Sequence, residues 1–184
     1  MLKIIKTFFN GKIKLIEVKN FKDKRGYFAE IYNKKNFSDI GIKDNFVQDN
    51  QSLSITKGTL RGMHFQSPPY HQAKLVSVSK GSIQDVVVDL RKNSVFYGQH
   101  ISIILKENDF NQLYIPKGFA HGFCSLKNNT IINYKTSNFY SKKHEYSLLW
   151  KDKNLSINWK ISKNYIISKK DQKGIKFNDF KSPF

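Results

Sequence analysis

Four residues whose side chains can move protons or hold charge lie close together near the middle of the sequence: Arg61, His64, Lys74 and Asp85. Histidine can act as a general acid or base near neutral pH, and a nearby cation can stabilise a developing negative charge. The segments that begin at Lys74 and just before Asp85 alternate roughly between polar and apolar residues, which sends every second side chain of a strand to one face. A charged residue on an inward face is costly unless it is paired or faces a wet cavity. The sequence therefore predicts a polar cavity inside a β-sheet structure.

The sequence carries no signature of a nucleophilic or nucleotide-cofactor enzyme. It contains no Gly-x-Ser-x-Gly segment, no phosphate-binding glycine loop and no dinucleotide fingerprint. Its one cysteine, Cys124, stands in an apolar run, so we expect it to be buried rather than reactive. The chemistry that remains is proton transfer by histidine, lysine, tyrosine and carboxylate side chains, with no cofactor.

A second motif surrounds His121. The pattern Pro-x-Gly-x-x-His at residues 116–121 resembles the second motif of the cupins, double-stranded β-helix barrels also called jelly rolls. Metal-binding cupins have two histidines two positions apart in their first motif, whereas residues 64–66 here read His-Phe-Gln. Glutamine is a poor ligand for a transition metal, and the ammonium of Lys74 would repel a divalent cation. We therefore expect a jelly roll without a metal, in which His121 is either a substrate-binding residue or a core histidine bonded to its neighbours.

The remaining chain predicts many short strands and one short helix. Asn10-Gly11 between apolar segments is a strong hairpin signal, and a turn is expected at Arg25-Gly26. Residues 34–40 predict a short helix that ends at Gly41. These turn signals and the near absence of helical periodicity indicate an all-β sandwich or barrel.

Two further features complete the expected fold. Gln48 and Asn50 lie two apart in a strand and share a face, which is either exposed or turned toward the base or sugar of a ligand. The final 30 or so residues show little periodicity and are expected to wrap the barrel as an irregular tail. The sequence thus predicts a single jelly-roll domain over residues 1–184, with a short helix and an irregular C-terminal tail.

The chain is strongly basic, with 32 Lys and Arg against 14 Asp and Glu and a net charge of +18. The lysines are spread along the whole chain, which favours a solvated surface, then attraction of a phosphorylated small molecule, and least of all nucleic acid. No apolar run is long enough to span a membrane or to form a secretory signal. One cysteine excludes an internal disulfide, so we expect a reduced, cytoplasmic setting.

Segments distributed over nearly the whole chain resemble the dTDP-4-dehydrorhamnose 3,5-epimerase family. In order, they are Arg25-Gly-x-Phe-x-Glu, Gln48-Asp-Asn, Leu60-Arg-Gly-x-His-Phe-Gln, Gln72-Ala-Lys-Leu-Val, Asp85-Val-Val-Val-Asp-Leu-Arg, Ile115-Pro-x-Gly-Phe-Ala-His-Gly-Phe and Leu149-Trp-x-Asp. So many segments in the right order are a stronger signal than any one motif.

The resemblance implies roles for individual residues. It makes His64 the catalytic base and Asp171 the carboxylate that pairs with it, while Lys74 lies near the keto oxygen and Tyr134 is the acid on the opposite face. It implies that Arg61, and Arg25 from a partner subunit of a homodimer, contact the diphosphate. Positions matched to the nucleotide surroundings are Glu30, Gln48, Asn50, Tyr140 and Lys170.

The expected reaction inverts C3 and C5 of a nucleotide-linked 4-keto-6-deoxyhexose. The keto group acidifies the hydrogens on both carbons, so His64 can remove one, Lys74 can stabilise the enolate and Tyr134 can return a proton from the other face. Epimerisation at C3 alone and a 3,4-ketoisomerase reaction are the nearest alternatives. A basic nucleic-acid-binding protein and a metal-dependent cupin oxygenase are more distant ones, the latter disfavoured by Gln66.

Overall fold

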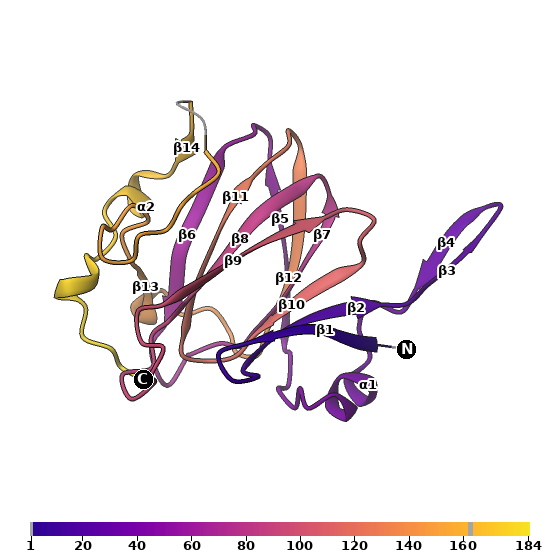
Figure 1. The fold of residues 1–184 in the computed structure, drawn as a ribbon, viewed down its shortest axis with the longest axis horizontal. Coiled ribbons are helices and arrows are strands. Elements are labelled where there is room, and N and C mark those ends of the chain that lie inside the picture. The colour runs from indigo at the N-terminus through magenta and orange to yellow at the C-terminus, as the bar shows by residue number, and fades with distance from the viewer. Residues whose placement is uncertain (1, 162–163) are drawn as a thin grey trace.

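Two antiparallel β-sheets facing each other form the body of the computed structural model, which describes residues 2–161 and 164–184 (Figure 1). The first sheet has the order β1 (Leu2–Phe8), β2 (Ile13–Val18), β10 (Asn111–Ile115), β7 (Lys74–Lys80), β12 (Thr130–Thr136) and β5 (Gln48–Ser54). The second has the order β13 (Glu145–Ser147), β6 (Thr59–Gln66), β11 (Phe119–Ser125), β8 (Ser82–Asp89) and β9 (His100–Lys106), and β14 (Ile166–Ile167) pairs with β6 in parallel. The expected all-β jelly roll is confirmed.

The main core lies between the two sheets. Val76 and Ile132 of the first sheet pack against Ile83, Val87 and Leu105 of the second, and these side chains are almost fully buried. Burial of each such side chain contributes about 1.5–3 kcal/mol. The alternating strand pattern thus places an apolar layer at the centre, next to the polar residues that share its inward face.

The second sheet is covered on its outer face as well. Every residue of β8 and β11 is buried, because Trp150, Leu155 and Trp159 of the C-terminal segment pack against that face. The expected tail around the barrel is confirmed, and Figure 1 shows it beside β6 at the left. The tail also includes the short elements α2 (Lys169–Gln172) and η2 (Phe177–Asp179), and η1 (Lys142–His144) precedes it; the sequence pattern revealed none of these elements.

The N-terminal region has the hairpin loop and the helix ends that its sequence indicates. Asn10 and Gly11 have positive φ in the loop that joins β1 to β2. The helix α1 (Lys34–Asp39) begins at Asn33, whose side chain accepts hydrogen bonds from the first turn, and its predicted end is confirmed at Gly41. The described residues contain no helix long and apolar enough to span a membrane.

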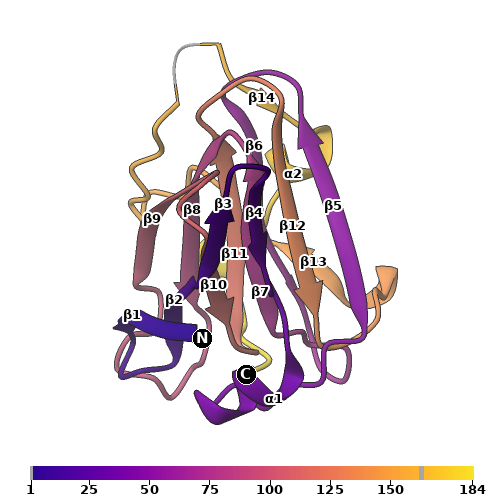
Figure 2. The same ribbon diagram turned by 90° about the vertical axis from the view of Figure 1, so that its right-hand side faces the viewer.

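A two-stranded arm leaves the body between β2 and α1. It consists of β3 (Asn20–Asp23) and β4 (Gly26–Ala29), joined by the predicted turn, and Figures 1 and 2 show it projecting away from both sheets. Phe21, Tyr27 and Phe28 on the arm are more than half exposed. An isolated two-stranded hairpin is marginally stable in water, so these apolar side chains leave the arm in need of a partner surface.

Candidate active site

A cavity of about 490 Å³ opens between the two sheets and the C-terminal tail. The polar side chains that line it come from both sheets and from α2 with its N-cap, and they are Ser52, Thr59, Arg61, His64, Lys74, His121, Tyr134, Glu145, Ser168, Lys170 and Asp171. The polar cavity expected from the sequence is therefore present, and it brings together residues more than a hundred positions apart.

Arg61 and His64 face the same cavity because β6 is irregular between them. Side chains three positions apart in a regular strand point to opposite faces. Here Arg61 lies opposite Phe123 and His64 opposite His121, so β6 has one residue more than β11 between these pairs. At this point Gly62 has a φ of +138°, and a Cβ there would lie only 2.5 Å from the Cα of Gly122. The two backbones therefore approach each other at Gly62 more closely than a side chain there would allow.

His64 and Asp171 form a hydrogen-bonded pair in the cavity. Nε2 of His64 lies 2.7 Å from Oδ1 of Asp171, and the Gly62 N–H lies 3.4 Å from Oδ2. Burial opposes ionisation of Asp171, but His64, Gly62 and Ser168 together lower the pKa of its carboxyl below the ordinary value. A carboxylate that accepts a hydrogen bond from Nε2–H fixes the tautomer in which Nδ1 is free to take up a proton.

Lys74 and Tyr134 enter the cavity from the first sheet, across from His64. Burial lowers the pKa of the Lys74 ammonium to about 8, although Asp85 and Glu145 oppose the change. Burial raises the pKa of the Tyr134 phenol, with Arg61 opposing and Glu145 adding to the effect. Among the described residues neither the Lys74 ammonium nor the Tyr134 hydroxyl has a hydrogen-bond partner. Both groups are therefore available to a molecule in the cavity.

His121 belongs to a second histidine–aspartate pair. Its Nε2 lies 2.9 and 3.0 Å from the two carboxylate oxygens of Asp85, and both side chains are buried. His121 is thus bonded to a neighbour, as one of the two alternatives predicted, and it also lines the cavity, while its role in substrate binding stays a prediction. The pairing was not predicted, although Asp85 shares the inward face of β8 with Ile83 and Val87.

Glu145 is a cavity residue that sequence reasoning missed. It lies on β13, and its carboxylate accepts a hydrogen bond from the Tyr140 hydroxyl at 2.8 Å and forms an ion pair with Lys170. Tyr140 itself is more than half exposed and lies at the rim rather than among the lining residues. The segment around Glu145 has no strong periodicity, so only the contact with Tyr140 and Lys170 identifies it.

Besides Tyr140, four residues expected at the site do not line the cavity of their own chain. Arg25 is 85% exposed at the tip of the arm and pairs with Asp23. Glu30 is hydrogen-bonded to Asn33 and Asn36 beside α1. Gln48 and Asn50 are joined by a 2.8 Å hydrogen bond on the face of β5 that also carries the cavity residue Ser52, which confirms their shared face.

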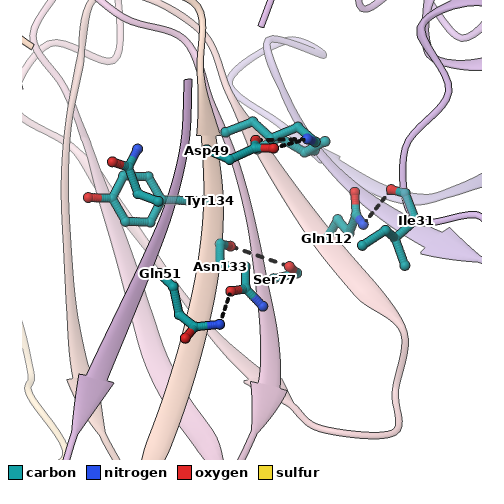
Figure 3. Close-up of a pocket in the computed structure, with 10 residues that line it drawn as sticks. Ile31, Asp49, Gln51, Ser77, Gln112, Asn133 and Tyr134 are labelled. Carbon is teal, nitrogen blue, oxygen red and sulfur yellow. Dashed lines mark hydrogen bonds and ion pairs between the residues drawn. The ribbon is translucent and has the colours of Figure 1, made fainter. Parts of the chain in front are cut away.

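A separate hollow lies on the outer face of the first sheet. Gln51 and Asn133 are hydrogen-bonded across β5 and β12 there, and Gln112 donates to the Ile31 carbonyl. Figure 3 shows Tyr134 pointing to the opposite side of the sheet from these groups. The sheet thus directs the Tyr134 side chain inward and a network of amides outward.

No group of three or more His, Cys, Asp or Glu side chains that could hold a metal ion is found within residues 2–161 and 164–184.

Comparison with known proteins gives one consistent result. Residues 10–179 match the family model described as dTDP-4-dehydrorhamnose 3,5-epimerase. The chain is 46% identical over 179 residues to the enzyme of that name from Shigella flexneri, with 97% of each chain covered. It is similar to the Bacillus anthracis epimerase structure with TDP and PPi bound, at 45% identity and a TM-score of 0.93, over 96% of this chain and 100% of that one.

A third relative was solved with a sugar nucleotide. The Legionella pneumophila enzyme in complex with dTDP-4-keto-L-rhamnose is 40% identical, with a TM-score of 0.92, over 97% of this chain and 94% of that one. The chain therefore belongs to the dTDP-4-dehydrorhamnose 3,5-epimerase family and is an enzyme.

Proposed function

We propose that this protein converts dTDP-4-dehydro-6-deoxyglucose to dTDP-4-dehydrorhamnose by inverting C3 and C5 through enolate intermediates. The single observation that carries the proposal is the placement of His64 and Tyr134 on opposite walls of one cavity, with Lys74 beside them. A base on one side and an acid on the other is what inversion of a carbon by proton transfer requires. The activity by which the relatives are named supports the same substrate class.

In the first step His64 removes a proton from the carbon next to the keto group. The Nε2–H group of His64 donates a hydrogen bond to Asp171, which leaves the Nδ1 lone pair as the base. The lowered pKa of Asp171 keeps that carboxylate ionised near neutral pH, so it stabilises the imidazolium that forms. Repetition of the cycle at the second acidic carbon inverts both centres.

The enolate and its reprotonation need two more groups. The ammonium of Lys74 is placed to stabilise the enolate oxygen, because it has no hydrogen-bond or ion-pair partner within residues 2–161 and 164–184 and burial strengthens its field. The raised pKa of Tyr134 keeps its phenol protonated near neutral pH, so it has a proton to give. Delivery from the wall opposite His64 produces the inverted configuration.

The substrate's charged part requires cations at the cavity mouth. Arg61 lines the cavity and has a planar guanidinium suited to diphosphate oxygens. Around the nucleotide and sugar we place His121, Gln48, Asn50, Tyr140 and Lys170.

A second copy of the chain would complete the site. The arm that carries Arg25 exposes Phe21, Tyr27 and Phe28 and does not reach its own cavity. We infer a homodimer in which each arm packs against the partner and brings Arg25, with Glu30 near the arm's base, toward the partner's substrate. The domain then spans residues 1–184.

Proton NMR of dTDP-4-dehydro-6-deoxyglucose with the protein in deuterium oxide tests the function. The expected result is deuterium at both C3 and C5, with accumulation of the inverted product. Exchange at C3 alone would instead establish the C3-only alternative. If a folded protein that binds dTDP exchanges neither the C3 nor the C5 hydrogen, the proposal is contradicted.

A further inference from the structure

The side chain of Gln66 stands where metal-binding cupins have a histidine, yet it does not line the cavity. It is 5% exposed and bonded entirely to backbone groups. Its Nε2 donates to the carbonyls of Tyr70 at 2.7 Å and of Phe139 at 3.1 Å. Its Oε1 accepts a hydrogen bond from the Ser141 N–H at 2.6 Å. Only an amide can satisfy two carbonyls and one N–H in this way, so Gln66 connects chain segments.

The bonds of Gln66 lie on both sides of Tyr140. Phe139 and Ser141 are the chain neighbours of Tyr140, so one side chain fixes the peptide groups before and after it. The Tyr140 hydroxyl donates to Glu145 at 2.8 Å, and Glu145 lies directly opposite Gln66 in the pairing of β13 with β6. Gln66 thus positions both partners of this hydrogen bond, one through its side chain and the other through strand pairing.

Packing contributes little to the position of Tyr140, because more than half of its side chain is exposed. Two further amides join the same loops: Gln72 donates to the Asn138 carbonyl at 2.7 Å, and Asn138 donates to the Pro69 carbonyl at 3.1 Å. These two bonds lie before Tyr140 along the chain. Gln66 therefore provides a direct hold on the Tyr140 backbone that those bonds do not.

We propose that Gln66 is a positioning residue that holds Tyr140 at the cavity mouth for the nucleotide of the substrate. This rests on the proposed function, which places Tyr140 beside the nucleotide. An aromatic ring binds a base through its flat face, and a ring held in place beforehand loses less entropy on binding. The effect of Gln66 is therefore expected on nucleotide affinity and not on proton transfer by His64.

The test is a double-mutant cycle on dTDP affinity, measured by titration calorimetry. Gln66→Met keeps the approximate length of the side chain and removes all three hydrogen bonds without adding charge. Tyr140→Ala should weaken dTDP binding about tenfold or more, as loss of a ring stacked on a base does. Gln66→Met should weaken it about threefold to tenfold. In the Tyr140→Ala background Gln66→Met should have little further effect, because the group through which it acts is gone.

Gln84 offers a matched control in the second sheet. It is also buried, donates to the Asn158 carbonyl at 2.8 Å and accepts from the Lys160 N–H at 2.5 Å, but it does not line the cavity. Gln84→Met should therefore lower the free energy of unfolding, measured by chemical denaturation, and keep the parental dTDP affinity within about twofold. Gln66→Asn, whose shorter amide cannot make all three bonds, replaces Gln66→Met in the cycle if the methionine variant does not fold.

Parental dTDP affinity in a folded Gln66 variant would overturn the inference. So would a loss of affinity by the same factor with and without the Tyr140 ring, or an equal loss in Gln84→Met, which would indicate a merely structural effect. In the active enzyme KM should rise in Gln66→Met while kcat changes by less than about twofold. If the parent binds dTDP but exchanges no substrate hydrogens, the proposed reaction fails and the cycle still decides the role of Gln66.

Discussion

Nε2 of His64 lies 2.7 Å from Oδ1 of Asp171, although 107 positions separate the two residues in the sequence. The contact joins β6 of the second sheet to the C-terminal tail. The tail is held there by the parallel pairing of β14 with β6 and by Ser168, whose side chain accepts a hydrogen bond from the Asp171 N–H. The proposed base and the group that orients it therefore depend on docking of the tail.

His64→Asn is expected to abolish solvent exchange at both C3 and C5, since it removes the proposed base. Positioned acid–base groups raise a reaction rate roughly 10²–10⁴-fold. Asp171→Asn should therefore lower kcat by a factor in that range, while slow exchange of the substrate hydrogens continues. Affinity for dTDP in both variants should stay within about tenfold of the parent, or about 1.4 kcal/mol. Exchange at the parental rate in His64→Asn would point to another base.

The pH dependence follows from the shifts at Lys74 and Asp171. Lys74 is charged below its pKa of about 8, so kcat/KM should fall as the pH rises through that value. Asp171 has a lowered pKa and is ionised at neutral pH, so the rate should also fall when strong acid protonates it. In Lys74→Arg the guanidinium stays charged, so kcat/KM should not fall near pH 8, whatever the maximal rate of the variant. A fall near pH 8 that persists in Lys74→Arg would assign that limb to another group.

The position of Arg25 can be tested with mixed dimers. If Arg25 serves the partner's cavity, an Arg25→Ala chain paired with a His64→Asn chain forms one intact site. A random mixture of the two inactive variants should then recover about a quarter of the parental activity, since half the dimers are mixed and each has one good site. The control is the parent mixed with a chain that carries both substitutions, where about a quarter of the parental activity should remain if Arg25 serves the partner's cavity, and about half if it serves its own. No recovery in the first mixture would contradict an arm that crosses between subunits.

Gly62→Ala should destabilise the fold and disturb the site. The added Cβ would combine an unfavourable positive φ with a 2.5 Å approach to the Gly122 Cα, at a cost of about 2 kcal/mol or more. Gly11→Ala has positive φ but open space around the new Cβ, so its cost should be about 1 kcal/mol. Chemical denaturation of both variants measures the difference. Equal costs would show that the contact with Gly122 contributes nothing.

The sequence predicted the features that depend on local pattern. Turn signals indicated an all-β sandwich or barrel, alternation indicated the polar cavity that Lys74 lines, and Asn10-Gly11 indicated the first hairpin. The pairing of Asp85 with His121 escaped prediction, because it depends on which strands become neighbours in the second sheet.

Glu145 escaped prediction for a similar reason. It reaches the cavity from a three-residue strand that carries no periodic signal, and α2 is too short to produce a helical pattern. Resemblance, rather than pattern, pointed to Asp171, Tyr140 and Lys170 in these segments. Arg25 and Glu30 could not be placed at a site from pattern alone, because the sequence pattern of one chain does not predict which surface an exposed arm contacts.

The most direct test of the central claim is Tyr134→Phe, which keeps the ring and removes only the hydroxyl. In deuterium oxide, His64 can still remove protons from the substrate, but the enolate lacks its donor on the opposite wall. Reprotonation should then occur mostly from the face that lost the proton. We therefore expect the variant to incorporate deuterium at C3 and C5 with little inversion of either carbon, both followed in one NMR experiment. Deuterium incorporation and inversion that fall by the same factor, or do not fall at all, would contradict an account in which His64 and Tyr134 act from opposite faces.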